Sequence, residues 1–449
     1  MLIGLVIGVA LLVFLLLRTK IHAFPAMIIA AAATGLVGGM VPTAISSSII
    51  AGFGSTLGSI GIVIGFGVMM GRILEVSGAA ERMAYTFLRL FGKTRPQWAM
   101  AVTGFMVSIP IFVDSGFVIL TPLAKALSRR SGKSVLTMGV ALAAGLATTH
   151  HLVPPTPGPL GSAGIFGANI GQMILWGILF AIPAMIVGVL YAQWLGRKIY
   201  QIPSEDGESW ERKEWQPALE KVVQLEAQAN LPSAFLSFAP IVAPIILILF
   251  NTVLSAMKAT GPAAQFLIFL GTPVIAVLVG LLFAIYGLGA KMDRKSILKQ
   301  MEEGVTSAGI ILLVTGAGGA LGQVIRDSGT GNYLAEILAA SPLPPILLPF
   351  VIASVLRLVQ GSGTTAMLTA ASISAPILNG LGVNPVFAAQ SAAMGAFVFS
   401  YFNDSLFWVV NRMLGIEEAR EQIMTWSVPT TLMWLTSGIT LVIANALFG

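Results

Sequence analysis

The chain has 449 residues, of which 56% are hydrophobic and only 10% are charged. Soluble domains carry roughly 25% charged residues, so a soluble globular protein, a disordered chain and a coiled coil are all excluded. The net charge of +6 does not indicate nucleic-acid binding, because the basic residues form short clusters between apolar segments. The chain has no cysteine, which excludes disulfides and thiolate metal sites.

The N-terminal segment 2–17 is predicted to be a membrane span rather than a cleaved signal. Its apolar residues come first and Arg18 and Lys20 follow, whereas a secretory signal places its positive charges before the apolar run. Further apolar stretches are long enough to cross about 30 Å of hydrocarbon. They are 23–41, 56–74, 135–165, 171–196, 233–251, 263–288, 304–323, 385–411 and 427–448.

Two other apolar stretches, 97–127 and 343–378, are interrupted in the middle by Pro, Gly and Ser. We interpret them as re-entrant hairpins, because non-helical backbone at membrane depth is tolerated only where protein or a water-filled cavity covers it. The chain is then an all-α polytopic membrane protein with about ten spans and two hairpins.

The distribution of positive charge tests this topology. All but three of the 25 Lys and Arg residues fall on one predicted side, and only Lys258, Arg326 and Arg357 remain for the other side or for membrane depth. Because cytoplasmic loops carry the excess of Lys and Arg, both termini are predicted to lie outside and the loop 201–232 to be cytoplasmic. We interpret this loop as a solvated linker between two halves.

The two halves repeat each other in sequence. The same spacing occurs in Gly67, Gly71, Ser77 and Gly78 and in Gly318, Gly322, Ser328 and Gly329, and Ser115-Gly116 corresponds to Ser362-Gly363. Each half, 1–200 and 233–449, then contains three spans, a hairpin, an interrupted span (135–165 or 385–411) and a final span. An odd number of crossings inverts the second repeat, and inverted repeats with discontinuous helices are typical of secondary transporters.

Few ionisable residues are predicted at membrane depth. Asp114 lies in the first hairpin, Arg357 in the second, and Asp404 in the interrupted span 385–411. A charge at the bilayer centre costs at least about 2.5–3.5 kcal/mol, so such residues are rare and usually functional. A purely structural ion pair between Arg357 and Asp404 is the alternative.

The span 135–165 is broken after a pair of histidines. The proline-rich segment 154–159 follows His150 and His151, and proline ends a helix because it lacks a backbone donor. We expect the helix to stop near His151 and to leave polar groups exposed inside the protein. Adjacent side chains on a helix point about 100° apart, so no metal site is predicted. His150 is a candidate proton carrier, with a buried, hydrogen-bonded histidine as the alternative.

Segments at the breaks and in the second hairpin resemble one known family. Residues 149–159 (THHLVPPTPGP), 355–362 (VLRLVQGS) and 402–408 (FNDSLFW) are similar to stretches of the gluconate:proton symporter (gluconate permease) family, and the resemblance covers essentially the whole chain. It implies the fold of the wider ion-transporter superfamily, with paired hairpins and elevator-type movement. It also implies uptake of gluconate, related sugar acids, D-serine or small hydroxy acids.

The predicted function is therefore import of gluconate or a related sugar acid or small hydroxy-carboxylate by proton symport, with no cofactor or metal. Arginine suits a carboxylate because its guanidinium is a bidentate fork, and helix N-termini add partial positive charge. A charged carboxylate beside an anionic solute is unfavourable, so buried acids are the coupling candidates. The predicted substrate-binding residues are Ser115, Gly116, Thr149, His150, Arg357, Gln360, Ser362, Gly363, Thr364, Asn403 and Asp404. The predicted proton-coupling residues are Asp114, Asp404 and His150.

Three positions depart from the family pattern. Thr156 and Tyr401 stand where the family often has His, and Asp114 stands where Glu is expected. A sodium-coupled carboxylate or D-serine transporter of the same fold is therefore the alternative. An enzyme is not predicted, because no nucleophile–base pair or metal-ligand set stands out, and an internal acid with paired hairpins favours a carrier over a channel.

The sequence also predicts a scaffold, a possible partner subunit and a cellular location. The spans near 2–41 and 233–288 carry no buried charge, so they are expected to form a scaffold, and family-level similarity suggests that they join two copies in a homodimer. The chain is expected in the cell's inner (plasma) membrane, in contact with lipid and a small carboxylate and not with nucleic acid.

Overall fold

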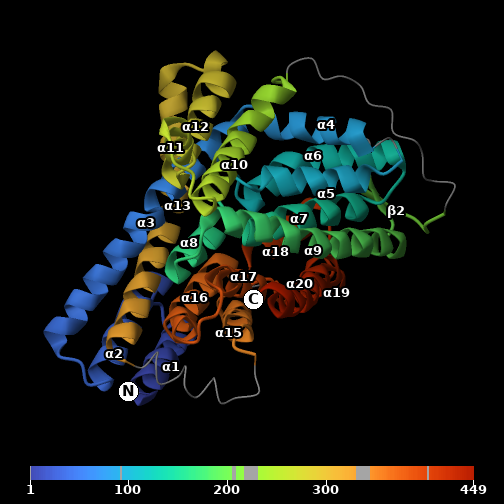
Figure 1. Cartoon of the computed structure of the whole chain (residues 1–449). Helices are drawn as coiled ribbons and strands as arrows, with labels where there is room; N and C mark the ends of the chain where they lie inside the picture. The colour runs from blue at the N-terminus through green and yellow to red at the C-terminus, as the bar shows by residue number, and fades with distance from the viewer. Residues whose placement is uncertain (1, 92–93, 205–208, 217–230, 330–343, 402–403) are drawn as a thin grey trace.

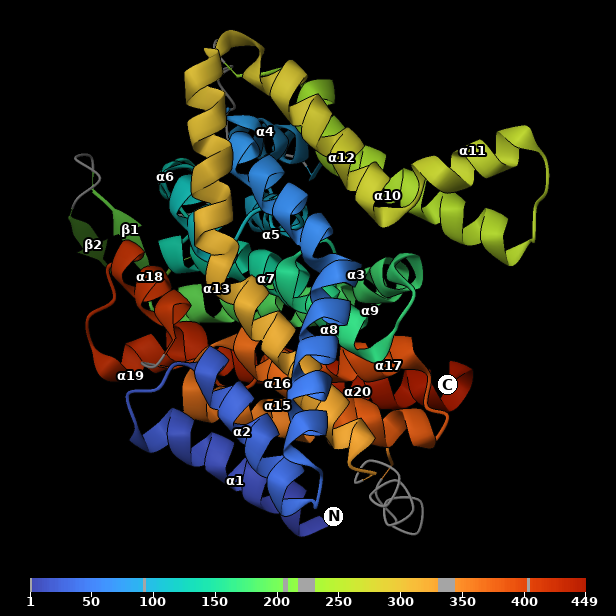
Figure 2. The ribbon, with the colours of Figure 1, turned by 90° about the vertical axis from the view of Figure 1, so that its left-hand side faces the viewer.

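The computed structural model describes residues 2–91, 94–204, 209–216, 231–329, 344–401 and 404–449. These residues are mostly helical, as the sequence predicts, and they include one two-stranded sheet. Figure 1 shows the elements in chain order, and Figure 2 shows the molecule after a 90° turn.

Two long helices, α3 (Pro42–Val76) and α13 (Arg294–Asp327), cross the front of the molecule in Figure 2. They pack closely because glycines face each other: a Cβ atom at Gly52 would lie 2.4 Å from the carbonyl oxygen of Gly319. Small residues allow membrane helices to approach in this way. Two N-terminal helices pack beside this pair: α1 (Leu2–Arg18) and α2 (Ala23–Val37).

A group of helices projects to one side in Figure 2. The segment 263–288, predicted as one span, is divided, because Gly271 ends one helix and Pro273 begins the next. The apolar stretch that could cross a membrane is instead Pro273–Lys291. The group consists of α10 (Ala234–Ala256), α11 (Pro262–Leu270), α12 (Pro273–Phe283), the π-helix η2 (Ala284–Leu288) and the 3-10 helix η3 (Gly289–Lys291).

Both predicted hairpins are helix–break–helix units. In the first hairpin, the chain turns at Ser108–Phe112. In the second, it turns at Gly361, whose φ of 75° suits glycine. The Ser362 hydroxyl then accepts a hydrogen bond from the amide of Thr365 and caps the start of the next helix. The arms are α5 (Pro96–Val107), α6 (Val113–Ser131), α15 (Leu347–Gln360) and α16 (Gly363–Gly380). Residue 343, the predicted start of the second hairpin, lies outside the described residues.

Both interrupted spans are broken where predicted. The first helix ends at Leu152, one residue beyond the expected end, and the next begins at Pro157. In the second half one helix ends at Gly395 and the next begins at Ser405. The four helices are α7 (Val135–Leu152), α8 (Pro157–Phe166), α17 (Pro385–Gly395) and α18 (Ser405–Met413).

The last helix of each half is long and apolar. α9 spans Ile170–Lys198, and α20 (Val428–Phe448) continues the short α19 (Ala419–Gln422) through the π-helix η4 (Ile423–Ser427). The helix α4 (Ala79–Phe91) was not predicted; one face, with Ala80, Met83 and Ala84, is buried while charged residues occupy the other.

Six helices are long and apolar enough to cross a membrane, or seven if the two halves of the bent α3 are one span, and shorter apolar helices accompany them among the described residues. The count of ten spans, the inverted relation of the halves and the orientation of the termini stay predictions. The order of long helix, hairpin, broken span and long helix does recur, as α3 to α9 and as α13 to α20.

The core of the molecule lies around α7, which is buried along its whole length. α5, α6 and α9 pack around it, as Figure 1 shows, and α8 packs against α16 and α17. The break that follows α7, residues 153–156, is buried, and so are residues 396–398 at the start of the break that follows α17.

The start of the predicted linker is a packed β-hairpin rather than a solvated chain. Strands β1 (Gln201–Pro203) and β2 (Trp210–Arg212) pair antiparallel. The buried Gln201 side chain donates to the carbonyl of Leu414 at 2.7 Å and accepts from Arg212 at 2.8 Å. The β-hairpin thus joins the end of α9 to the segment after α18. Residues 217–230 of the linker lie outside the described residues.

Candidate functional site

The starts of three helices meet at one cavity, which we call the central cavity. Its volume is about 320 Å³. α6, α16 and α18 begin at its wall, and α7 ends there. The lining residues are Val113, Asp114, His150, His151, Arg357, Gly361, Ser362, Gly363, Thr364, Asp404, Ser405 and Leu406.

Arg357 and Asp404 form the ion pair that sequence analysis kept as the alternative. Arg357 Nη2 lies 2.6 Å from Asp404 Oδ2, and the two residues are only 5% and 8% exposed. The Ser400 hydroxyl also donates to Asp404. Arg357 Nε and Nη1, however, are buried without a partner among the described residues. Because buried donors are rarely left unpaired, these two donor nitrogens point to a ligand.

Asp114 links the first hairpin to the second broken span. It lies in the first turn of α6, and its carboxylate oxygens accept from the Ser405 hydroxyl at 3.3 and 3.4 Å. Asp404, the neighbour of Ser405, also caps α18 by accepting from the amide of Leu406. The two acids predicted to couple transport therefore lie at the same cavity, on elements that are far apart in the sequence.

The two histidines both line the central cavity, although sequence analysis selected only His150. His151 Nδ1 lies 2.9 Å from the carbonyl oxygen of Ala147, and its ring stacks on Phe397 with a centroid distance of 4.4 Å. His150 Nδ1 and His151 Nε2 have no hydrogen-bond partner among the described residues. The unpartnered nitrogen of His150 therefore remains available for a solute, whereas His151 Nε2 packs against Gly363.

A second cavity, which we call the adjoining cavity, lies beside the central one. Its volume is about 380 Å³, and it shares Asp114, His150, Ser362 and Thr364 with the central cavity. Ser115 lines this cavity and not the central one. Ile310 and Val314 of α13 form another part of its wall.

The other predicted residues have different positions. Gly116 packs against Leu146 of α7, where a Cβ atom would lie 2.7 Å from a leucine methyl group. Thr149 is fully buried and lines neither cavity. Asn403 lies outside the described residues, and of Gln360 only the backbone, at the end of α15, is described.

Ser405, Thr365 and the α13 residues of the adjoining cavity were not predicted from the sequence. Ser405 stands within the FNDSLFW segment, so its position next to Asp404 was an available signal. Ile310 and Val314 carry no such signal, because apolar residues in an apolar helix look alike. Among the described residues, no group of three or more His, Asp or Glu is placed to hold a metal.

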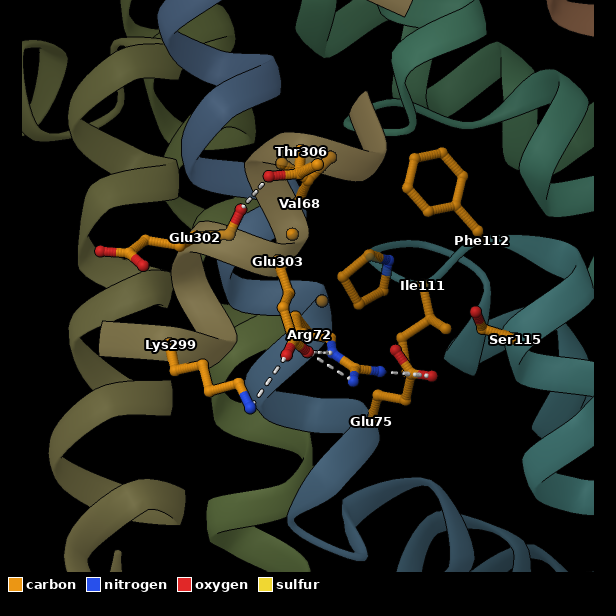
Figure 3. A pocket seen from close by; sticks show the side chains of 13 residues that line it. Val68, Arg72, Glu75, Ile111, Phe112, Ser115, Lys299, Glu302, Glu303 and Thr306 are labelled. Carbon is orange, nitrogen blue, oxygen red and sulfur yellow. Dashed lines mark hydrogen bonds and ion pairs between the residues drawn. The ribbon is translucent and has the colours of Figure 1, made fainter. Parts of the chain in front are cut away.

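A third cavity, of about 570 Å³, shares Phe112 and Ser115 with the adjoining cavity, and we call it the Arg72 cavity. Figure 3 shows Arg72 of α3 beside two carboxylates. Its Nη1 lies 2.9 Å from Glu75, and its Nη2 lies 2.8 Å from Glu303 of α13. The three cavities are therefore neighbours, because the adjoining cavity shares lining residues with both the Arg72 cavity and the central cavity.

Comparison with known proteins shows the family of the chain. The profile of the GntP family permeases matches residues 1–447. An uncharacterized permease of Haemophilus influenzae is 53% identical over 100% of this chain and 92% of its own length. A protein of Pseudomonas aeruginosa named gluconate permease is 34% identical over 94% of this chain and 92% of its own length.

The fold has a counterpart among solved structures. The YdaH transporter of Alcanivorax borkumensis superimposes with a TM-score of 0.67 at 15% identity, over 94% of this chain and 98% of that one. At this identity the likeness concerns the fold alone, whereas the family match and the permease relatives concern the sequence itself. The chain is therefore a multi-pass transporter, not an enzyme, and belongs to the GntP permease family.

Proposed function

We propose that this permease imports gluconate, or a related sugar acid or small hydroxy-carboxylate, by proton symport. The observation that carries the proposal is the pair of unpartnered Arg357 donors, Nε and Nη1, at the central cavity. The volume of about 320 Å³ falls within the range of roughly 300–1,000 Å³ that is usual for small-molecule sites. The relative from Pseudomonas aeruginosa is named a gluconate permease.

The carboxylate of the substrate would bind where positive charge converges. Arg357 supplies two N–H donors, and the N-termini of α6 and α16 face the same space. Unpaired amides at a helix start carry partial positive charge and bind anions. The hydroxyl groups of the substrate would then reach His150, Ser362 and Thr364, which line both the central and the adjoining cavity.

The proton would be carried by Asp114 or by Asp404, with His150 as a further candidate. An ionised carboxylate next to an anionic substrate is unfavourable, whereas a protonated one is not. Asp404 is already neutralised in part by Arg357. Asp114, whose partner is the hydroxyl of Ser405, has no cation bound to it among the described residues and is the stronger candidate for the coupling proton.

Alternating access of the elevator type is supported by an asymmetry between the halves. Gly71 of α3 faces the tip of the first hairpin, with Pro110 as its neighbour, whereas the equivalent Gly322 of α13 faces Ser372. Ser372 lies nine residues into α16, which is about 14 Å along the helix at 1.5 Å per residue. A shift of the hairpins by such a distance would exchange the two arrangements.

Uptake into vesicles with an imposed pH or sodium gradient tests the coupling. We expect labelled gluconate to accumulate with a proton gradient, and Asp114→Asn to retain binding but to lose accumulation. Accumulation driven by sodium alone would favour the sodium-coupled alternative. If both Asp114→Asn and Asp404→Asn retained proton-driven accumulation, the coupling assignment would be wrong.

The substrate assignment has its own test. Arg357→Ala should weaken gluconate binding by roughly tenfold or more, because charge-assisted hydrogen bonds contribute about 1.5–3 kcal/mol. Arg294→Ala, at the exposed start of α13, is the matched control and should bind normally. Competition by a panel of sugar acids, hydroxy acids and D-serine identifies the substrate. Unchanged affinity in Arg357→Ala would contradict the carboxylate assignment.

A further inference from the structure

The Arg72 cavity has a counterpart built from the same positions of the second half. The sequence repeat pairs Gly67 with Gly318 and Gly71 with Gly322. In that register, the α3 residues that line the Arg72 cavity are Val68, Gly71, Arg72 and Glu75, and their equivalents are Gly319, Gly322, Gln323 and Arg326. All four equivalents line one other cavity, of about 290 Å³, which we call the Arg326 cavity.

The Arg326 cavity is separate from the site in this structure. It shares no lining residue with the central, adjoining or Arg72 cavities. Its walls include Phe166 at the end of α8 and Asn379 near the end of α16. The same two helices begin close to the central cavity, where Gly158 of α8 packs against Thr364 of α16. The Arg326 cavity therefore lies at the far end of the helices that carry the site.

The two cavities differ in charge. In the Arg72 cavity, Glu75 and Glu303 bind Arg72, Lys299 lies 3.9 Å from Glu303, and Glu302 adds a third carboxylate. Figure 3 shows this network, with the cations engaged by acids. The carboxylates outnumber the cations that line this cavity.

In the Arg326 cavity the balance is reversed. Arg326 is its one charged lining residue, and it is exposed, with no ion pair among the described residues. The neighbouring Asp327 does not line the cavity; it accepts from Ser48 at 2.6 Å and from Gln323 at 2.9 Å. Ser55, Thr56 and Asn379 add polar groups that suit hydroxyls.

We propose that the Arg326 cavity is a docking site for small carboxylate anions, at the opposite end of the transport path from the Arg72 cavity. Arg326 would draw the anion in and hold it until the start of α16 moves to it, because a cation in a confined cavity raises the local anion concentration. The excess of carboxylates in the Arg72 cavity would repel the transported anion and so favour its release there. The inference rests on the proposed function, and the predicted topology leaves Arg326 for the outer side or for membrane depth.

Single-cysteine labelling tests the charge directly. The chain has no cysteine, so Ser55→Cys and its repeat equivalent Thr306→Cys each provide one exposed thiol at the two cavities. Methanethiosulfonate reagents of opposite charge serve as probes. At Ser55→Cys we expect the anionic reagent to react faster than the cationic one by roughly threefold to tenfold, and at Thr306→Cys we expect the opposite order.

Substitutions at Arg326 connect the charge to the substrate. We also expect gluconate to slow the labelling of Ser55→Cys. In that background, Arg326→Gln should abolish both this protection and the anionic preference, and should raise the KM for gluconate uptake roughly tenfold. Arg326→Lys should keep the preference. Lys258→Gln, which removes another exposed cation from the same predicted side, should change neither measurement.

The outcomes separate this inference from the proposed function. If the chain takes up gluconate but Arg326→Gln keeps the reagent preference and the protection, the docking site is wrong. Failure of gluconate to protect Ser55→Cys in a transporting chain also overturns it. If the chain transports no gluconate under any gradient, the proposed function fails, while the reagent preference still reports whether Arg326 sets the charge of its cavity.

Discussion

At Gly363 the chain has no room for even one methyl group. A Cβ atom there would lie 2.5 Å from His151 Nε2. The imidazole cannot move aside freely, because it stacks on Phe397 and contacts the carbonyl of Ala147. The start of α16 can therefore reach the central cavity only with glycine at this position.

We predict that Gly363→Ala destabilises the protein by about 1–3 kcal/mol, the usual result of overpacking, and lowers gluconate affinity by displacing α16. Gly54→Ala is the control, because a Cβ atom at Gly54 meets no atom within 4 Å. Thermal unfolding in detergent measures the first effect and substrate binding the second. Adding His151→Ala to Gly363→Ala should restore part of the stability; no recovery would contradict the proposed steric cause.

Single residues differ in how far the sequence predicts them. Asp114, Arg357 and Asp404 could be selected because charge at membrane depth needs a reason, and the structure brings all three to one cavity. The sequence could not show whether Gly116 contacts substrate or packs against a neighbouring helix, because small residues serve both close packing and ligand approach. The pairing of Arg357 with Asp404 was named from sequence only as an alternative, because it depends on the position of α15 beside the second break, which no local pattern encodes.

Among the elements, the breaks were predictable and the packing between elements was not. Proline and glycine interrupt helices for local reasons, so the helix breaks within 97–127, 135–165, 343–378 and 385–411 could be predicted from sequence. That these units are re-entrant hairpins and interrupted membrane spans stays a prediction. α4 was not predicted because charged residues alternate with its apolar residues, so the segment does not read as an apolar stretch. The β-hairpin was missed because three-residue strands carry almost no pattern of their own, and their stability comes from contacts with distant segments.

The β-hairpin gives a prediction at the element scale. Gln201→Ala removes the donor to the Leu414 carbonyl and the acceptor for Arg212, and a buried group left unpaired costs about 1–3 kcal/mol. We expect a lower unfolding temperature and faster proteolysis of the linker. Lys213→Gln breaks only an exposed ion pair with Glu211 and should change stability little. Equal effects of the two substitutions would show that the buried hydrogen bonds of Gln201 do not stabilise the β-hairpin.

At the scale of the whole molecule, composition alone identified a helical membrane protein, and the recurrence of glycine spacing indicated two related halves. The different contacts of Gly71 and Gly322 could not be foreseen, because a repeat in sequence predicts equal surroundings. The different contacts of these two glycines belong to one of the two arrangements between which the molecule is proposed to alternate.

α3 and α13 are longer than a lipid bilayer requires. They have 35 and 34 residues, which corresponds to about 50 Å of straight helix against a hydrocarbon thickness of about 30 Å. The apolar part of α13, Ala308–Asp327, has 20 residues and matches that thickness, so the charged start of this helix extends beyond the hydrocarbon, and α3 bends by 45° between Gly58 and Gly61. Because this pair carries both the Arg72 and the Arg326 cavity, lipid thickness should set their separation across the membrane.

The transporter should therefore respond to the lipids around it. In liposomes of increasing acyl-chain length, we expect the uptake rate to pass through a maximum while the affinity of the central cavity stays constant. A rate that does not depend on acyl-chain length would mean that the long helices absorb the mismatch at their ends, and that bilayer thickness has no control over the turnover of this permease.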